Sequence, residues 1–425
     1  MMRVLAGLLI VAAVATIYAH STSAYFFNDD FHWLAQTQSF APLDMLDLDR
    51  YQHFYRPVIE LYFFAGLTLF GCHPFPFHLA SVALHLLTTL AVFRLGRALS
   101  TGETLAFLSA LFFAVQPGLV DAVTWIAAIT DLLPVLWYVL AVWLHLEFLK
   151  HRRRSWYVAT IVAFALCHLT HESAATLLPM LLLAEFTFAA AGPGRERLAT
   201  VTRHWISYVP YAIVLAGFLF VAYAVNTRSY LVQEGHYRFG AHAGPNIVNY
   251  MIWLYVGQRA AIDYVATLAT TGALLVWGTP RMRFAIAWIV ITLLPVAFFT
   301  WENAPRYLYL PAVGFALLAA DLLLVLQRWV ARRTSARAAQ GVLVAVAAVL
   351  AIRFAIFAKK AADSFPARTV NYERFVRELR SANPDAAPAG TVIIDQRHLE
   401  GVPELYREPA ARVGLCLPHV RLELR

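Results

Sequence analysis

Residues 4–34, VLAGLLIVAAVATIYAHSTSAYFFNDDFHWL, place an apolar run of membrane-spanning length directly before two adjacent carboxylates, Asp29 and Asp30. A carboxylate near the centre of a bilayer costs about 2.5–3.5 kcal/mol, so the pair cannot help the run to insert. Its position beyond the run predicts a loop at the membrane surface. The surrounding aromatic side chains predict a partly dehydrated setting, where a carboxylate is a stronger base. The stretch therefore predicts a membrane protein that handles a ligand at one surface.

The composition of the whole chain is that of a polytopic membrane protein. Of its 425 residues, 60% are hydrophobic and 14% are charged, and the mean hydropathy is +0.60. Soluble domains are nearer one half apolar and one quarter charged. The net charge of +8 comes from basic residues that lie between the apolar runs and form no stripe with interleaved aromatics. This charge therefore indicates topology and argues against a nucleic-acid partner.

The apolar runs predict an all-α bundle of about 11 transmembrane helices. We expect these helices at 4–20, 76–94, 104–116, 123–148, 156–170, 174–190, 205–225, 259–278, 283–300, 307–327 and 341–358. Segments 57–71 and 246–258 are expected as interfacial or re-entrant helices, the first of them within an outer loop at 21–75. The N-terminal run has features of a signal peptide, but its length favours an uncleaved anchor.

Basic residues predict which loops face inward. With the N-terminus inside, the inner loops hold most of the Arg and Lys residues, in agreement with the positive-inside rule. The same threading brings Asp29, Asp30, Asp121, Glu172 and Arg306 to the outer side. The polar residues best suited to chemistry are thus expected on one face.

Beyond a membrane domain at 1–358, residues 359–425 are expected to form a small extramembrane tail, whose side of the membrane the sequence leaves open. Within the tail, NYERFVRELRSA predicts an amphipathic helix, and TVIIDQ and VRLELR predict short strands. The three cysteines, Cys72, Cys167 and Cys416, fit no metal or redox spacing.

Several side chains near the predicted outer surface are candidates for ligand binding. His32 follows the acidic pair and can orient a carboxylate or bind a ligand. Arg306, between the aromatic residues of WENAPRYLYLP, has the planar guanidinium that binds phosphate through paired hydrogen bonds. An arginine at the end of a span also snorkels to lipid headgroups. Arg56, before Pro57, is a second candidate of the same kind.

Two further groups contain acids. His168, His171 and Glu172 stand at i, i+3 and i+4, a spacing that allows part of a metal site but is more common in a hydrogen-bonded cluster at a helix end. Asp121 and Asp131 flank the entrance of the fourth span, and an acid inside the membrane is a functional candidate by default.

Five stretches resemble, in order along the chain, the integral-membrane glycosyltransferases of the GT-C type, which use polyprenyl-phosphate-linked sugars. The likeness is greatest to the transmembrane-and-TPR O-mannosyltransferases and their bacterial relatives. The stretches are NDDFHWL (28–34), YRPVIELYFFAGLTLFGCHPFPFHLASVALH (55–85), VQPGLVDAVTWIAAITDLL (115–133), THESAATLLPMLLLAEF (170–186) and APRYLYLPAVGF (304–315). Two positions depart from the family pattern: Gln116 stands where His precedes Pro, and His171 stands where Lys precedes Glu. The helical repeats of the eukaryotic members are missing.

The resemblance implies transfer of a sugar from a polyprenyl-phosphate donor to an acceptor hydroxyl, with inversion at the anomeric carbon. Asp29 is then expected as the general base, Asp30 as its orienting or sugar-binding neighbour, and Arg306 with Arg56 as the groups that stabilise the departing phosphate. The other expected contacts with substrate are His32, Asp121, Glu172, Tyr307 and Tyr309. A divalent metal, Mg or Mn, is a possible cofactor, with Asp29, Asp121 and Glu172 as its ligands.

The implied setting is a bacterial inner membrane, with the site facing the periplasm among membrane lipids. The acceptor is left open between a protein, a glycan and a lipid. A transporter or flippase for a lipid-linked sugar would use the same acids and arginines, and is expected to show two symmetric halves. A polysaccharide polymerase or ligase would favour arginine-rich outer loops over an acidic pair.

Overall fold

The computed structural model is almost entirely helical and describes residues 2–51, 54–100, 102–190, 192–257, 260–301, 304–387 and 390–424. The α-helices in these ranges are α1 Met2–Tyr18, α2 Asp29–Thr37, α3 Pro57–Phe70, α4 Pro74–Ala98, α5 Glu103–Ala114, α6 Val120–Thr124, α7 Ile129–His151, α8 Arg154–His168, α9 Leu177–Ala184, α10 Gly194–Arg203, α11 Trp205–Asn226, α12 Tyr230–Gln233, α13 Ala243–Tyr255, α14 Ala261–Trp277, α15 Pro280–Ala297, α16 Pro311–Ala331, α17 Ala336–Ala382 and α18 Glu404–Leu415.

Short 3₁₀ helices, and a π-helical turn at η7, connect these elements. They are η1 Ser21–Ser23, η2 Pro42–Leu46, η3 Leu48–Arg50, η4 Pro117–Leu119, η5 Ile126–Ala128, η6 Glu172–Thr176, η7 Glu185–Ala189, η8 Pro305–Leu308 and η9 Gln396–Leu399. The two strands, β1 Thr391–Ile394 and β2 Arg421–Leu424, pair in parallel, with Thr391 opposite Arg421. The strands predicted in the tail are therefore confirmed.

Seven helical segments in the described residues are long and apolar enough to cross a membrane. They are Pro74–Ala98, Ile126–His151, Glu172–Ala189, Trp205–Asn226, Pro280–Ala297, Pro311–Ala331 and Ala336–Ala382. An eighth is possible if Glu103–Ala114 and Pro117–Thr124, which meet at 54°, form one broken span. The break falls at Pro117, because proline lacks the amide hydrogen that a continuous helix needs.

The predicted count of about 11 transmembrane helices is not confirmed. Three predicted spans, at 4–20, 156–170 and 259–278, are not among these long apolar helices, and residue 259 lies outside the described residues. They correspond to α1, α8 and α14, which have 17, 15 and 17 residues. At 1.5 Å per residue these helices are about 22–26 Å long, shorter than a hydrocarbon core of about 30 Å. The segments predicted as interfacial or re-entrant, 57–71 and 246–258, correspond to helices α3 and α13, and residue 258 lies outside the described residues.

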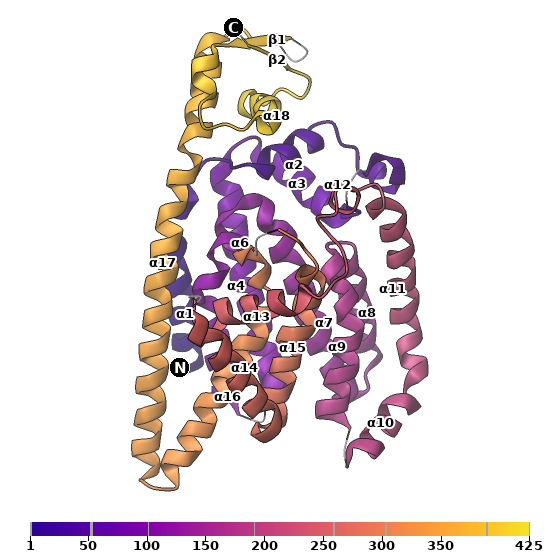
Figure 1. Cartoon of the computed structure of the whole chain (residues 1–425), viewed down its shortest axis with the longest axis vertical. Coiled ribbons are helices and arrows are strands. Elements are labelled where there is room, and N and C mark those ends of the chain that lie inside the picture. Colours follow the sequence, from indigo (N-terminus) through magenta and orange to yellow (C-terminus); the bar gives the residue numbers. More distant parts are fainter. Residues whose placement is uncertain are drawn as a thin grey trace.

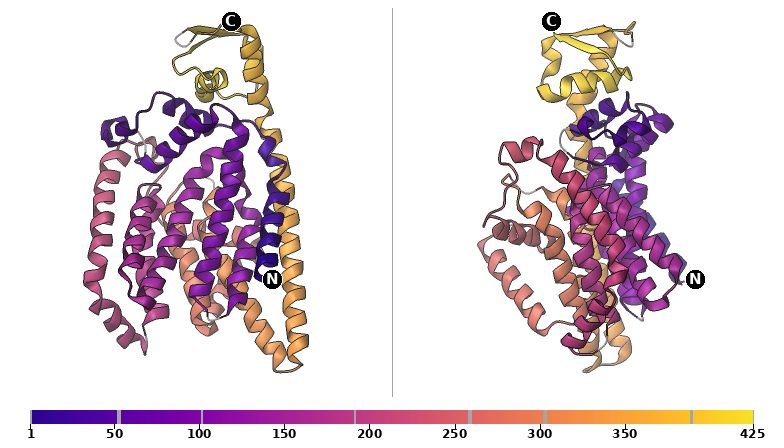
Figure 2. Two further views of the ribbon diagram at one scale, coloured as in Figure 1. Left: turned by 180° about the vertical axis from the view of Figure 1, so that it is seen from behind. Right: turned by 90° about the vertical axis from the view of Figure 1, so that its right-hand side faces the viewer.

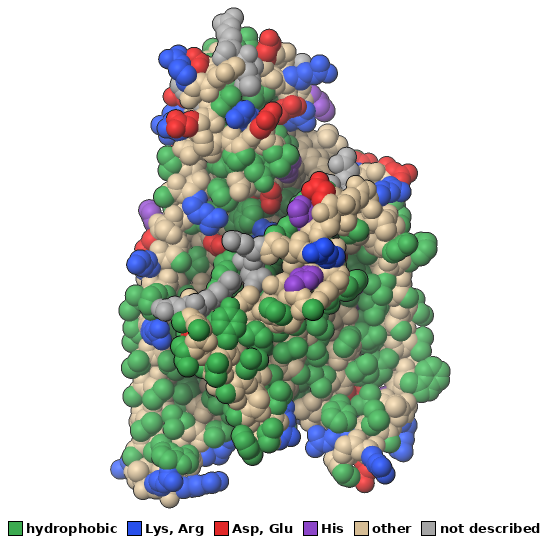
Figure 3. Space-filling model, viewed as in Figure 1, with side chains coloured by type: hydrophobic (Ala, Val, Ile, Leu, Met, Phe, Trp, Pro, Cys, Tyr) green, Lys and Arg blue, Asp and Glu red, His purple; other side chains and the backbone are tan. Residues whose placement is uncertain are grey.

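The two ends of the bundle differ in charge and in the elements they carry. Hydrophobic side chains cover the middle of the face shown in Figure 3, and Lys and Arg side chains gather at its lower end over α10 and the α16–α17 turn. Helices α2, α3 and α12 lie at the opposite end (Figure 1). The predicted inner and outer loops thus fall at opposite ends of the molecule.

Helix α17 joins the bundle to the tail without a break. Its 47 residues span about 70 Å, so the helix continues through the predicted boundary at 358 and contains the predicted amphipathic segment. Its first half packs beside α1, and its second half projects beyond the bundle into the tail (Figures 1 and 2). The tail therefore lies at the same end as α2, which the sequence had left open.

The tail is fastened to this end by a covalent bond. Cys72, between α3 and α4, forms a disulfide with Cys416 at the end of α18, 344 residues later in the sequence. Helix α18 packs against α2, and Gln38 donates a hydrogen bond to the Arg412 carbonyl at 3.4 Å. The disulfide and these contacts dock the tail onto the bundle. The third cysteine, Cys167, is buried and free.

Candidate functional site

The acidic pair sits on a turn with an unusual backbone. Asn28, just before α2, has φ 47° and ψ −115°, and a positive φ is uncommon outside glycine, although Asn is among the residues that tolerate it. The Asn28 side-chain oxygen accepts a hydrogen bond from the Tyr372 hydroxyl of α17. Strain of this kind costs about 1–3 kcal/mol and persists where the surroundings enforce it, often at functional sites. Here the turn separates the environments of Asp29 and Asp30.

Asp30 is held inside the protein. Its side chain is 0% exposed, and its two oxygens accept hydrogen bonds from the amides of Phe27 at 2.8 Å and Ala127 at 2.6 Å. Burial raises the pKa of the Asp30 carboxyl well above its usual range, although both amides oppose the shift. Because both oxygens are engaged away from solvent, Asp30 fastens the turn to η5 and is poorly placed to act as a base.

Asp29 has a different environment. It is only half-buried, and its Oδ1 accepts a hydrogen bond from the Tyr406 hydroxyl of α18 at 2.7 Å. Burial and Asp29 together raise the pKa of the Tyr406 phenol, so the phenol remains the donor. The His32 ring packs edge-on against Tyr406, with 5.2 Å between ring centroids. Of the two acids, Asp29 is the one that a substrate can reach.

Arg306 lies in η8, and its guanidinium lacks a hydrogen-bond partner for one of its nitrogens within the described residues. Its guanidinium lies over the Trp125 ring, 4.7 Å from the centroid, and its Nε is 3.5 Å from Asp131 Oδ2. That Nε is buried, yet within the described part of the chain it makes no hydrogen bond. Burial opposes the cation, but Tyr307, Asp131 and Asp29 raise the pKa of Arg306 above its ordinary value. A buried, charged donor without a full set of partners suits an anionic ligand.

Tyr230 of α12 connects the surroundings of Asp29 and Arg306. Burial and then the charge of Asp29 raise the pKa of its phenol, Tyr307 raises it further, and Arg306 lowers it. Trp125 provides the geometric link. Its ring lies under the Arg306 guanidinium, and its Nε1 donates to the Phe27 carbonyl of the acidic turn at 3.1 Å, so the arginine lies beside the turn that carries the acids.

The two tyrosines that follow Arg306 have separate surroundings. The Tyr307 ring stacks on Phe299 with 5.7 Å between centroids, and its hydroxyl lies 3.4 Å from Arg306 Nη2. Tyr309 is 1% exposed and its hydroxyl meets His85 Nδ1 of α4 at 2.8 Å. Tyr307 is therefore a neighbour of the candidate phosphate-binding group, whereas the Tyr309 hydroxyl is engaged in the core.

Arg56 is engaged by Glu172. Arg56 Nη2 and Nε donate to Glu172 Oε2 at 2.6 Å and 3.1 Å, and the guanidinium lies over the Phe54 ring, 4.1 Å from the centroid. Burial, followed by the charge of Arg56, lowers the pKa of the neighbouring His171 to about 3, so this imidazole is neutral. The pair joins the start of α3 to the start of η6 and gives the Arg-Pro motif a structural role.

We expect Arg56→Met to lower the stability of the protein by about 3 kcal/mol, because it leaves the Glu172 carboxylate largely buried without its partner. The measurement is the midpoint of thermal unfolding in detergent. Replacing both residues, as Arg56→Met with Glu172→Met, should recover most of the loss. The matched control is Arg377→Met, which breaks an exposed pair with Glu373 and should change stability by less than about 1 kcal/mol. Equal losses in the two arginine variants would contradict this role.

The acids predicted as metal ligands are not brought together. Asp121 pairs with Arg368 of α17 at 3.0 Å, Glu172 pairs with Arg56, and Asp29 pairs with Tyr406. In the part of the chain that the structure describes, no group of three His, Cys, Asp or Glu side chains is arranged to hold a metal ion. The predicted set of Asp29, Asp121 and Glu172 therefore does not fit a metal in this structure, since each acid has a different partner.

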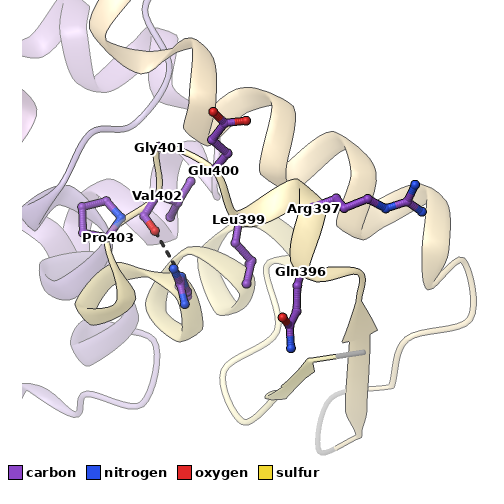
Figure 4. Close-up of a pocket in the computed structure, with 8 residues that line it drawn as sticks. Gln396, Arg397, Leu399, Glu400, Gly401, Val402 and Pro403 are labelled. Carbon is purple, nitrogen blue, oxygen red and sulfur yellow. Dashed lines mark hydrogen bonds between the residues drawn. The ribbon is translucent and has the colours of Figure 1, made fainter.

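A hollow in the tail is separate from this site. Figure 4 shows residues that line it around the turn between η9 and α18, among them Gln396, Leu399, Glu400 and Pro403. Arg407 also lines it and donates through Nε to the Val402 carbonyl at 3.1 Å. None of the predicted site residues lines this hollow.

Three residues that complete the site were missed in the sequence. Arg368 and Tyr372 come from α17 and Tyr406 from α18, and each contacts a residue of the acidic turn or of α6. They lie 247, 344 and 377 residues from their partners. Only the amphipathic pattern of NYERFVRELRSA, which contains Tyr372, indicated that this part of the tail has a buried face.

Comparison with known proteins identifies similar sequences over part of the chain. Residues 56–223 match the model of the family described as dolichyl-phosphate-mannose-protein mannosyltransferase. Over 88 residues the chain is 39% identical to Protein O-mannosyl-transferase TMTC1 of Mus musculus, and 38% identical to that of Homo sapiens. The first alignment covers 20% of this chain and 9% of the mouse protein, so it spans only about a tenth of these relatives. The matched family range contains Arg56, Asp121 and Glu172 but neither Asp29 nor Arg306.

Solved structures share the fold over nearly the whole chain. ArnT from Cupriavidus metallidurans bound to undecaprenyl phosphate is similar with a TM-score of 0.56 and 15% identity, covering 98% of this chain and 85% of that one. The apo oligosaccharyltransferase of Archaeoglobus fulgidus is similar with a TM-score of 0.52 and 14% identity, covering 96% and 63%. The predicted resemblance to the GT-C glycosyltransferases is confirmed, and the chain is a multi-pass membrane protein with their fold.

Proposed function

We propose that this protein is a glycosyltransferase that moves a sugar from a polyprenyl-phosphate-linked donor to an acceptor hydroxyl. The observation that carries the proposal is that a reachable carboxylate, Asp29, lies near a partly buried guanidinium, Arg306, whose buried Nε makes no hydrogen bond in the described part of the chain. A carboxylate can accept the proton of a hydroxyl, and a guanidinium can bind a phosphate. ArnT, which shares the fold, binds undecaprenyl phosphate, and the matching family is named for a dolichyl-phosphate-mannose donor, which supports this donor class.

In the proposed reaction, the acceptor oxygen attacks the anomeric carbon of the sugar. Asp29 takes the hydroxyl proton, the new carbon–oxygen bond forms, and the bond from the anomeric carbon to the phosphate oxygen breaks. The bonding electrons leave with the lipid phosphate, and Arg306 stabilises the charge that develops there. Attack opposite to the departing phosphate inverts the anomeric carbon. Asp30 acts indirectly, by fixing the turn that presents Asp29.

The proposal puts the site on the outer face of the membrane, in a bacterium the periplasmic face of the inner membrane. Two observations support this side. Exposed basic residues lie at the opposite end, over α10 and the α16–α17 turn, as the positive-inside rule expects for a cytoplasmic end. The disulfide between Cys72 and Cys416 lies at the end that carries the site, and disulfides persist in oxidising compartments.

The test of the function is a transfer assay in membranes that contain the protein. We expect radiolabelled mannose on polyprenyl phosphate to move into a non-lipid or new lipid product, whereas membranes without the protein leave the label on the donor. Other polyprenyl-phosphate sugars, tested in parallel, define the sugar. Movement of intact donor across sealed vesicles without cleavage of the sugar–phosphate bond would indicate a flippase and overturn the proposal.

A further inference from the structure

Helix α18 of the tail reaches the acidic motif through a hydrogen bond to Asp29. The Tyr406 hydroxyl of α18 donates to Asp29 Oδ1 at 2.7 Å, and the Tyr406 ring lies against His32 and, with 6.4 Å between centroids, against Tyr372. Burial and Asp29 keep this phenol protonated, so its hydrogen is directed at the carboxylate oxygen. A half-buried carboxylate with one oxygen held in this way has a restricted orientation.

Several bonds hold α18 in the position that makes this contact. The disulfide between Cys72 and Cys416 closes the C-terminal end of the helix onto the α3–α4 connection. Arg380 of α17 donates from Nε and Nη2 to the Gly414 carbonyl at 2.9 and 2.6 Å. Gln38, directly after α2, donates to the Arg412 carbonyl at 3.4 Å. The helix that carries Tyr406 is thus attached at its C-terminal end to the residue after α2, to α17 and to the α3–α4 connection.

We infer that the tail is a working part of the site: Tyr406 is a positioning residue that orients the Asp29 carboxylate toward the acceptor hydroxyl, and the Cys72–Cys416 disulfide keeps Tyr406 in place. The inference rests on the proposed function. A free carboxylate rotates about its side-chain bonds, and a base aligned with the proton it removes acts faster than one that samples many orientations. The contact favours turnover more than donor binding, because the donor phosphate is held by Arg306.

The first test is Tyr406→Phe, which removes the hydroxyl and keeps the ring. We expect kcat for transfer from polyprenyl-phosphate mannose to fall about tenfold, which corresponds to loss of one hydrogen bond to a charged group, while the donor KM changes less than about twofold. In an Asp29→Asn background the same change should alter the residual rate less than about twofold. The control is Tyr223→Phe on the lipid-facing side of α11, where the tyrosine is 75% exposed.

The second test concerns the disulfide. Dithiothreitol should lower the wild-type rate about tenfold, to the level of Tyr406→Phe, since both treatments lose the same contact. It should leave the rates of Tyr406→Phe and of Cys72→Ser with Cys416→Ser unchanged. Cys167→Ala should retain the sensitivity of the wild type to dithiothreitol.

The outcomes separate this inference from the function on which it rests. An inactive wild type overturns the proposed function. An active wild type with an unchanged Tyr406→Phe rate overturns the positioning role. A Tyr406→Phe variant with raised donor KM, a lowered unfolding temperature and a similar loss in the Asp29→Asn background shows a structural role for the hydroxyl and also overturns it.

Discussion

Asp29→Asn is expected to lower the rate of sugar transfer about 10³-fold while donor binding is retained. The amide has nearly the shape of the carboxylate and still accepts the Tyr406 hydrogen bond, but it cannot take the proton of the acceptor hydroxyl. Loss of a general base typically reduces rate by about 10²–10⁴-fold. The measurement is initial transfer rate from polyprenyl-phosphate mannose, together with equilibrium binding of undecaprenyl phosphate.

A matched control distinguishes loss of the base from loss of one charge on the outer loop. Asp47→Asn makes the same change at an exposed position of that loop, where Asp47 caps η3 and Asn also caps well. Its rate should equal that of the wild type. A folded Asp29→Asn variant that transfers sugar at a near-normal rate would refute the assignment of the base.

Arg306→Ala is expected to lower kcat about 10²–10³-fold, the usual effect of removing one group that stabilises developing negative charge. Arg306→Lys should fall between the wild type and Arg306→Ala, because an ammonium restores the charge without the planar pair of donors. Undecaprenyl phosphate should bind more weakly to both variants. The measurements are kcat for transfer and the dissociation constant of undecaprenyl phosphate.

The control for Arg306 is Arg228→Ala, at a guanidinium that pairs with Asp49 and is 55% exposed. An exposed ion pair of this kind contributes little to the stability of the protein, so transfer and phosphate binding should be unchanged. Because removal of Arg306 also leaves Asp131 unpaired, the unfolding temperature of each variant is measured as well. Wild-type phosphate affinity in a stable Arg306→Ala variant would argue against the phosphate-binding role.

The fold could be predicted from the sequence where helices are long and uniformly apolar. Helices such as α11 and α16 exceed 20 residues, and a hydrocarbon core selects that length directly. The count is not confirmed at α1, α8 and α14, because composition marks a segment as apolar without saying how long its helix is. The sequence left the side of the tail open, because α17 combines a span and an extramembrane helix and no glycine or polar loop marks the change.

The site could be predicted only in its local parts. Asp29, Asp30 and Arg306 stand in short motifs whose chemistry is visible in adjacent residues, and the structure gives the first two distinct environments. Their partners are not local: Asp30 is held by the amide of Ala127, and a backbone amide has no sequence signature. Tyr406 is separated from Asp29 by 377 residues, and no periodic pattern connects positions so far apart.

The disulfide also imposes an order on biosynthesis. Cys72 is made 344 residues before Cys416, so at about 5–20 residues per second its thiol waits roughly 20–70 s for a partner. In that interval every span between them must insert, and the later cysteine must reach the same side as the earlier one. Closure of the bond therefore reports that insertion has finished correctly, and a nascent chain with a misplaced span would remain reduced.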